Sequence, residues 1–362
     1  MIKNSEIKVN PTILKTLRET SGYTIDEIAK KLNATKEKIE KTEEGVASFT
    51  LTQIKKLAGI YQRPLAAFFT KMLSTLPALP DYRINRNKRL TPNVFTAERR
   101  AYFLANKLTE LTNKKSQIPI FSETLKPDES AREFRKYLKA DLLKSIKVED
   151  TLIYYKQALE EKLLISIIEL PLKADDVRGF SISSDISIIV LNEGDNASIK
   201  LFSLFHETYH LIKRTSGICS IGLEQGEDSE RECDSFAAEF LVPLNDLKEE
   251  YRNFPELNED SVTGLSNIYG VSKQVIMLRL LQIRYLTHER YNQFKKEGEE
   301  KSKKNKKKAF ARRKWDKVFK NRVGNLVIKE TRTAYRSGKL SYSEVFDIFN
   351  MQTKYIEKFI EG

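Results

Sequence analysis

The sequence predicts a predominantly helical α+β protein. Across most of the 362 residues, apolar side chains recur every three or four positions, which is the period of amphipathic helices. Short runs rich in β-branched residues, broken by Gly, Pro, Asp and Asn, interrupt that pattern between residues 163 and 194 and predict a small sheet. We therefore expect an all-helical N-terminal domain, a middle domain that combines the sheet with helices, and a helical C-terminal region.

Changes in composition along the chain predict four segments, at residues 1–73, 74–140, 141–290 and 291–362. The first is a helical domain, and Pro77 and Pro80 mark its end. The second is a charged helical linker region. The third carries the sheet and a helical extension, and the fourth is a basic helical module.

The N-terminal segment predicts a helix-turn-helix. A first helix has Leu14 and Leu17 facing inward. Thr24 can cap a second helix, and after a short turn Thr35 can cap a third. Two short helices joined by a turn of three or four residues form this motif. Over about the first 70 residues it resembles the DNA-binding domain of the XRE family of repressors, with Gly45 ending the third helix as in that family.

Three lysines of the third helix are candidate DNA contacts: Lys36, Lys38 and Lys41. The same helix carries four glutamates: Glu37, Glu40, Glu43 and Glu44. Carboxylates near phosphates weaken the charge term that dominates DNA affinity. DNA binding by this domain therefore stays open, beside a role in protein docking or dimerisation.

The net charge of +13 is concentrated in the C-terminal segment. Residues 291–362 carry 20 basic and 9 acidic groups, and much of the excess lies in the run from Lys295 to Lys314. Such a run is either a solvated helix or flexible linker, or a patch that binds a polyanion. The sequence leaves both interpretations open.

Composition also indicates a cytoplasmic protein without a membrane partner. The sequence contains no run of 18 or more apolar residues, and its N-terminus lacks the apolar stretch and cleavage site of a secretory signal. Two cysteines, Cys219 and Cys233, are too few for a disulfide framework and fit a reducing compartment. The sequence does not indicate an oligomeric state.

The middle of the chain predicts strands at 163–171, 179–184 and 186–194, beside a helix at 198–213. Further along, two helices between residues 260 and 286 are separated by Gly270 and Ser272. This pair is either a second helix-turn-helix or, as we favour, part of a plain helical bundle.

The helix at 198–213 contains the pattern HETYH, from His206 to His210. Positions i and i+4 share one face of a helix, so both histidines can turn a ring nitrogen to one metal ion. Glu207 is placed to contact a water on that ion. This arrangement predicts a zinc site of the HExxH type.

A zinc hydrolase needs a third protein ligand and an open fourth position. The downstream stretch GEDSERECDSFAAEFLVP offers Glu230 as that ligand, and Asp234 can accept the far N–H of a ligating histidine. Glu227 and Glu232 stay open as rivals for the metal. Cys233 lies on the apolar face of this helix, so we expect it in the core.

Two further features bear on such a site. An edge strand beside the metal helix could receive an extended substrate peptide by β-augmentation, and either 179–184 or 186–192 could serve. Cys219 lies in the connection between the two metal helices, where a thiolate could occupy the open zinc position. Its proximity in sequence to the two metal helices is the one argument for Cys219 as a zinc ligand.

These residues carry a family resemblance. The runs RGFSISSDISIIVLN, LFSLFHETYH and EFLVP are similar to the ImmA/IrrE family of metallopeptidases, over about residues 150–245. The resemblance implies a zincin-like metallopeptidase fold that binds zinc and inactivates a protein partner, typically a repressor of a mobile element or stress regulon encoded by an adjacent gene. Carried over by position, it implies zinc ligands at His206, His210 and Glu230, a general base at Glu207, and Asp234 where the family has Asn or Asp.

Two large side chains depart from the family pattern. Phe205 and Tyr209 stand where the family has small residues, and they either narrow the cleft or thicken the core. Tyr209 falls on the apolar stripe of its helix, so we expect it in the core rather than in catalysis.

Two function hypotheses follow. The first is a cytoplasmic zinc metalloendopeptidase joined to an XRE-type helix-turn-helix domain, which cleaves a regulatory protein. The second is a DNA- or protein-binding, antitoxin-like regulator in which the zinc fold is a scaffold with little proteolytic activity. The basic C-terminal run is compatible with either.

Overall fold

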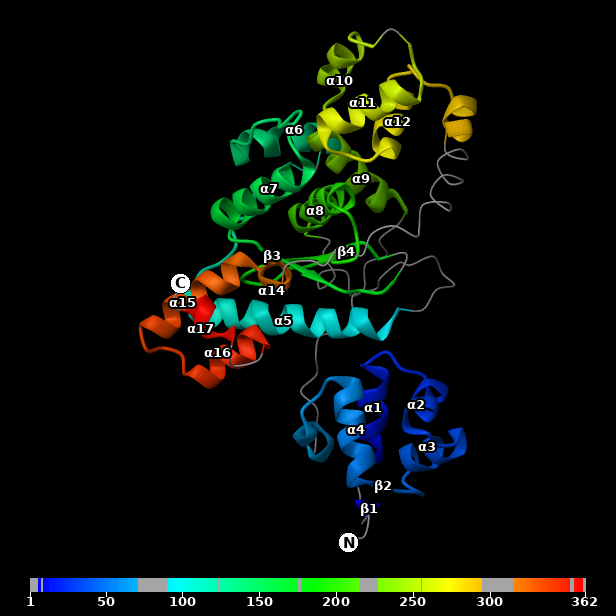
Figure 1. The fold of residues 1–362 in the computed structure, drawn as a ribbon, viewed down its shortest axis with the longest axis vertical. Helices are drawn as coiled ribbons and strands as arrows, with labels where there is room; N and C mark the ends of the chain where they lie inside the picture. The colour runs from blue at the N-terminus through cyan, green and yellow to red at the C-terminus, as the bar shows by residue number, and fades with distance from the viewer. Residues whose placement is uncertain are drawn as a thin grey trace. The chain divides into compact units, whose positions relative to one another are not determined.

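The computed structural model divides the chain into two compact units, which are described separately (Figure 1). Unit 1 comprises residues 1–100 and 172–176, and unit 2 comprises 101–171 and 177–362. The structure describes residues 6–7, 9–70, 90–122, 124–174, 177–214, 227–254, 256–294, 315–351 and 355–360. The boundary prolines at 77 and 80, Cys219 and the basic run at 295–314 lie outside the described residues.

Unit 1 is a small helical body with a short antiparallel strand pair. Its elements are β1 (Glu6–Ile7), α1 (Pro11–Glu19), α2 (Ile25–Leu32), α3 (Lys36–Glu43), β2 (Phe49–Thr50), α4 (Leu51–Tyr61) and the 3-10 helix η1 (Leu65–Phe69). Leu14 and Leu17 are buried, as their spacing predicts. The buried apolar residues of α1 to α4 and of η1 form one cluster.

The turn between α2 and α3 follows from local chemistry. Thr24 accepts a hydrogen bond from the Glu27 backbone N–H, and the Glu27 carboxylate bonds back to the Thr24 N–H, which forms a capping box. Asn33 ends α2 with a φ of 52°, in the left-handed region. Thr35 then caps α3. The predicted caps and the two short helices are confirmed, whereas the assignment to the XRE family stays a prediction.

An ion pair fastens α3 to α1. Arg18 Nε lies 2.7 Å from Glu43 Oε1, and both side chains are 8% exposed. Glu43 therefore belongs to the interior of unit 1 and does not oppose the lysines on the outer face of α3. On that outer face, Lys36 Nζ lies 3.7 Å from Asp26 of α2, and both side chains are at least half exposed.

Unit 2 contains the sheet and most of the helices. Its elements are the C-terminal part of α5 (Pro92–Thr112), α6 (Pro127–Leu138), α7 (Val148–Leu163), β3 (Ser166–Leu170), β4 (Gly179–Ile182), β5 (Ile188–Asn192), α8 (Ala197–Ile212), α9 (Glu227–Leu241), α10 (Leu244–Tyr251), α11 (Glu259–Tyr269), α12 (Lys273–Gln282), a short helix at 288–294, α14 (Trp315–Val323), α15 (Asn325–Arg336), α16 (Tyr342–Phe349) and α17 (Glu357–Ile360). The predicted α+β class, with its small sheet and predominance of helix, is confirmed. The described residues contain no helix that is long and apolar enough to cross a membrane.

The three strands pair in the order β3-β5-β4, with β3 parallel and β4 antiparallel to β5. All three predicted strands exist, with trimmed ends: residue 163 still belongs to α7, and Leu164 ends that helix with a φ of 55°. Because β5 lies between the other two, the idea that 186–192 is an edge strand is wrong. The alternative, 179–184, is right, since β4 lies at one edge of the sheet.

Helices cover both faces of the sheet. Figure 1 shows α8 on one side, with α14 and α15 on the other. At the junction of α14 and α15, Gly324 has a φ of 89°, and a Cβ there would meet the Ile167 carbonyl oxygen of β3 at 3.1 Å. Glycine is therefore required where these helices approach the sheet.

The pair α11 and α12 belongs to the main core of unit 2. Gly270 ends α11 in the left-handed conformation and Ser272 caps α12, as the sequence predicts. Their buried residues, including Val262 and Leu280, join the same apolar cluster as α8 and α9. The helical-bundle interpretation therefore describes them better than a separate helix-turn-helix.

A buried charge cluster joins α7, β3 and α8. Glu169 receives the Nζ atoms of Lys156 and Lys200 at 3.1 and 2.6 Å, and all three side chains are at most 8% exposed. Glu160 lies one turn from Lys156 and is also buried. Burial raises the pKa of Glu160 to about 7, although Lys156 and backbone hydrogen bonds oppose that rise.

The raised pKa of Glu160 predicts a pH-dependent stability. The folded carboxyl keeps a proton between pH 4.5 and about 7 that the unfolded chain releases, so the wild type loses stability as pH rises through this window. Glu160→Gln cannot ionise. We therefore expect its free energy of unfolding, relative to that of the wild type, to rise by up to roughly 3 kcal/mol between pH 4.5 and 8. Urea unfolding of metal-free protein at both pH values measures this. Glu161→Gln, at the exposed neighbouring position, is the control, and a Glu160→Gln gain that does not change with pH would contradict the expectation.

Candidate metal centre

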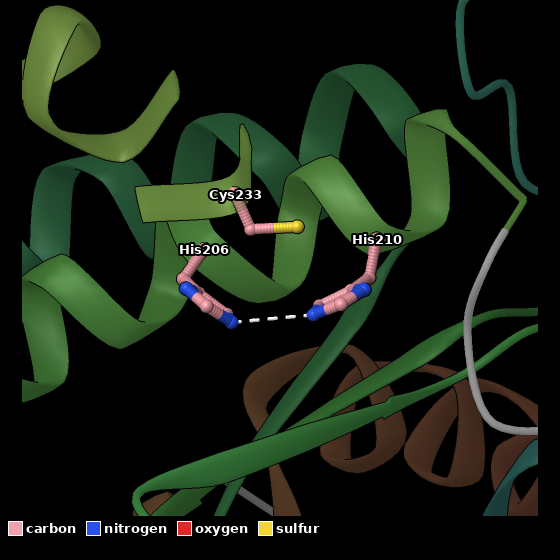
Figure 2. A group of neighbouring side chains, drawn as sticks. All are labelled: His206, His210 and Cys233. Carbon is pink, nitrogen blue, oxygen red and sulfur yellow. Dashed lines mark hydrogen bonds between the residues drawn. The ribbon is translucent and has the colours of Figure 1, made fainter. Parts of the chain in front are cut away.

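Helix α8 carries the histidine pair and is almost entirely buried. Asn196 caps its N-terminus by accepting a hydrogen bond from the Ile199 N–H. His206 and His210 lie one turn apart, and their Nε2 atoms are 3.2 Å from each other (Figure 2). The predicted arrangement of two ring nitrogens on one helix face is therefore present.

Helix α9 brings two carboxylates to the histidine pair, one on each side of the His206 ring. Glu230 Oε2 lies 3.2 Å from His206 Nε2, and Glu230 Oε1 lies 3.4 Å from His210 Nε2. Asp234, one turn further along α9, places Oδ1 2.9 Å from His206 Nδ1. An Nδ1–H donated to Asp234 leaves the Nε2 lone pair of His206 for a metal.

The three facing atoms fit the size of a zinc ion. Tetrahedral bonds of 2.0–2.2 Å put neighbouring nitrogen and oxygen ligands about 3.3 Å apart. The distances among His206 Nε2, His210 Nε2 and the Glu230 carboxylate are 3.2 to 3.4 Å. The donor set also suits zinc, which takes imidazole nitrogen and carboxylate oxygen.

The electrostatics of the cluster favour positive charge. Burial lowers the pKa of His206, but hydrogen bonds to Asp234 and Glu230, together with the charge of Glu207, outweigh burial and raise that pKa to about 10. A cation at Nε2 would interact with the same carboxylates. Positive charge at this point is thus stabilised by three acidic side chains.

Glu207 lies between the histidine pair and the edge strand β4. Its residue is 8% exposed, and a Cβ added to Gly179 of β4 would lie 3.6 Å from Glu207 Cγ. The same Cβ would meet the Val190 carbonyl oxygen at 2.7 Å, so this position in β4 has no room for a side chain. Glycine here allows β4 to approach β5 closely, and its contact with Glu207 is an ordinary van der Waals one.

The structure separates the rivals for the third ligand position. Glu232 Oε2 lies 3.5 Å from Lys213 Nζ, so its carboxylate is engaged away from the histidines. The side chain of Glu227 lies outside the described residues. Of the candidates whose side chains are described, Glu230 faces both rings.

Cys233 is buried, as predicted, but it is also part of the site. Its Sγ and one ring nitrogen each of His206 and His210 lie within 4.8 Å of one another (Figure 2). Burial and the surrounding carboxylates raise the pKa of this thiol well above its usual value. Spacing could have revealed the contact, because Cys233 follows Glu230 by three positions and therefore shares its helix face.

Phe205 and Tyr209 thicken the core and do not narrow a cleft. Phe205 is fully buried and stacks on Phe240 with ring centroids 3.8 Å apart. Tyr209 is 1% exposed and stacks on Phe236 at 4.4 Å. Of the two interpretations that the sequence leaves open, the second is right for both residues, and Tyr209 is a core residue as expected.

Ion pairs to one buried glutamate hold the C-terminal end of α9. Glu239 is 3% exposed and accepts hydrogen bonds from Arg279 of α12 and from Arg132 of α6, the latter at 3.0 Å. Arg279 also donates to the Val242 carbonyl oxygen at 3.0 Å. The helix that carries Glu230 is thus fastened to two neighbouring helices.

Comparison with known proteins supports this description in part. Residues 160–281, from the end of α7 to α12, match the family model of the IrrE N-terminal-like domain, a peptidase family. That region contains the sheet, α8 and α9, and the match supports the ImmA/IrrE resemblance for this part of the chain. No curated protein matches the sequence.

The crystal structure of Bacillus thuringiensis PlcR in complex with the peptide PapR7 and DNA is among the solved structures that the chain matches. The identity is 10%, the alignment covers 98% of this chain and 96% of that chain, and the TM-score is 0.16. At that TM-score the similarity carries no argument about fold or function.

The stacked aromatic pair predicts a large stability effect. We expect Phe205→Ala to lower the free energy of unfolding by about 3–5 kcal/mol, because it removes a fully buried ring and leaves a cavity. Phe346→Ala, at a position that is 40% exposed, is the control and should cost less than about 1 kcal/mol. Denaturant unfolding measures both variants. Equal costs would show that residue 205 does not support the core.

Proposed function

We propose that unit 2 is a zinc metalloendopeptidase with His206, His210 and Glu230 as metal ligands. The observation that carries this proposal is the convergence of two imidazole nitrogens and one carboxylate at 3.2 to 3.4 Å. The family match over residues 160–281 supports it. Asp234 holds the His206 ring in orientation through Nδ1.

The chemistry proposed is hydrolysis of a peptide bond. A bound zinc ion supplies a Lewis acid that lowers the pKa of a water molecule and polarises the scissile carbonyl. Glu207 takes the proton from the attacking water and delivers it to the leaving amine nitrogen. Its buried position next to both histidines suits this transfer.

The edge strand β4 provides a place for the substrate backbone. Arg178 O accepts from Asn192 N at 2.8 Å, which places residues 178, 180 and 182 in the positions that bond to β5. The backbone groups of Gly179 and Ser181 then point to the outer edge. In this proposal an extended substrate pairs with that edge beside Glu207.

We propose a protein substrate of regulatory type, such as a repressor of a mobile element or stress regulon encoded by an adjacent gene, cleaved in the cytoplasm. The support is the ImmA/IrrE resemblance together with a helix-turn-helix in the same chain. Specificity in this proposal comes from docking of the partner as well as from the cleft.

The peptidase proposal predicts separable effects of two variants. Glu207→Gln should keep stoichiometric zinc and lower cleavage of a coexpressed adjacent repressor by at least about 100-fold, because the proton acceptor is lost. Asp234→Asn should weaken zinc binding by about 10–100-fold through the loss of a charged acceptor for His206. Metal analysis and a cleavage assay measure these effects.

Glu232→Gln is the matched control, since that carboxylate faces Lys213 and should matter little for zinc. Full cleavage by Glu207→Gln would exclude the mechanism. Wild-type protein purified without stoichiometric zinc, and unable to take it up, would exclude the metal centre.

A second candidate function is DNA binding by unit 1, with unit 2 as a scaffold. One observation favours it: the buried Arg18–Glu43 pair removes one of the four opposing carboxylates from the outer face of α3. Phe205 and Tyr209 do not favour the scaffold alternative, because both lie in the core.

The DNA hypothesis predicts a change in salt dependence. Replacing Lys36, Lys38 and Lys41 with Ala should weaken binding to a DNA duplex from the promoter of the protein's own gene. It should also reduce the slope of the logarithm of the binding constant against the logarithm of salt concentration by about 2 to 3. Replacing Lys55 and Lys56, which are exposed on α4, is the control. Electrophoretic shifts at several salt concentrations measure the slopes. An unchanged slope in the α3 variant would leave unit 1 with a docking or dimerisation role.

A further inference from the structure

One side chain of the candidate metal centre has no place in the mechanism above. Cys233 follows Glu230 by three positions on α9, and its sulfur points toward the space between the two histidine rings (Figure 2). The residue is 1% exposed, so it belongs to the core as well as to the site. The side chain present is a thiol, which in its thiolate form is a preferred zinc ligand.

The surroundings of the thiol are acidic as well as apolar. The residue is 1% exposed, and the negative charges of Glu207, Glu230 and Asp234 lie close enough to raise the pKa of its thiol. Phe236 and Ala237, further along the same helix, are fully buried. Cys233 therefore sits where the apolar core of α8 and α9 meets the polar face of the site.

We infer that the Cys233 thiolate is the fourth ligand of the resting metal centre, in a closed set with His206, His210 and Glu230. This inference rests on the proposed function, because it needs the same metal. It adds regulation: the resting site has no open coordination position and the peptidase is latent. Hydrolysis then requires Cys233 to leave the metal.

The distances between the Cys233 sulfur and the two histidine rings allow this coordination. With a zinc–sulfur bond of about 2.3 Å and zinc–nitrogen bonds of about 2.0–2.1 Å, a tetrahedral site places sulfur and nitrogen about 3.5 Å apart. The sulfur and both ring nitrogens lie within 4.8 Å of one another. The sulfur and nitrogen atoms must therefore approach by about 1.3 Å at most to bind one ion.

The exchange balances without any redox partner. The S–H bond breaks, a sulfur–metal bond forms, the proton goes to solvent, and the water in the fourth position departs. When Cys233 leaves, it takes up a proton and water returns. A thiolate ligand also makes the site selective for soft metals, so zinc is favoured over manganese or magnesium.

Cobalt substitution of the full-length protein tests the inference without measuring activity. Co²⁺ in a tetrahedral site gives visible d–d bands, and a thiolate ligand adds a near-ultraviolet charge-transfer band. We expect the wild type to show both. Cys233→Ala should lose the charge-transfer band and keep the d–d bands, and Cys233→Ser is a second variant in case one of them folds poorly. Cys219→Ala, which removes the other cysteine of the chain, is the matched control and should keep both bands.

The outcomes separate the inference from the proposed function. Tetrahedral d–d bands without a charge-transfer band in the wild type would overturn the inference and leave the metal centre intact. A charge-transfer band that survives in Cys233→Ala, or is lost in Cys219→Ala, would also overturn it. No Co²⁺ binding by the wild type, or equal binding after His206→Ala and His210→Ala, would refute the proposed metal centre itself.

Metal selectivity gives an independent measurement. In competition between Zn²⁺ and Mn²⁺, Cys233→Ala should lower the preference for zinc by at least about tenfold relative to the wild type, because a soft ligand is removed. An unchanged preference would contradict thiolate ligation.

Discussion

The packing of helix α8 on helix α9 is the interaction on which the rest of unit 2 depends. Two stacked aromatic pairs, Phe205 on Phe240 and Tyr209 on Phe236, lie at the centre of this contact. Because interiors are close-packed, such pairs fix both the separation and the rotation of the helices. The distances between Glu230 and the histidine nitrogens follow from that fixed geometry. The large residues at 205 and 209 thus support the site from behind.

At the same interface, the apolar side chains of α9 that join the core lie within one helix turn of its charged side chains. One face of α9 joins the core, while Glu230 and Asp234 turn to His206. Burial alone would favour a neutral ring, yet the carboxylates outweigh it and raise the pKa of His206. In the proposed centre a metal ion would compete with that proton, and the gain from coordination would have to exceed the loss of the proton's interactions.

Much of this site could be predicted because helical periodicity acts over short range. The spacing of His206 and His210, and of Glu230 and Asp234, fixes which side chains share a face. Pairing between distant segments is less accessible: β4 and β5 are both largely buried, so hydrophobicity does not reveal which of the two lies at the edge. The Arg18–Glu43 pair joins residues 25 positions apart, and no local pattern distinguishes Glu43 from the other glutamates of α3.

The two ends of α9 are held by different forces. At the C-terminal end, Glu239 and Arg279 are 3% and 2% exposed, so removal of either would leave a buried, unpaired charge. Near the N-terminal end, the side chains of Glu230 and Asp234 are 48% and 61% exposed. Helix packing places their backbone, and the contacts with His206 orient the two side chains. A metal held by the two histidines and Glu230 would therefore add a second link between α8 and α9, beside the aromatic packing. The free energy of coordination would then stabilise the fold, because the ligands come from both helices.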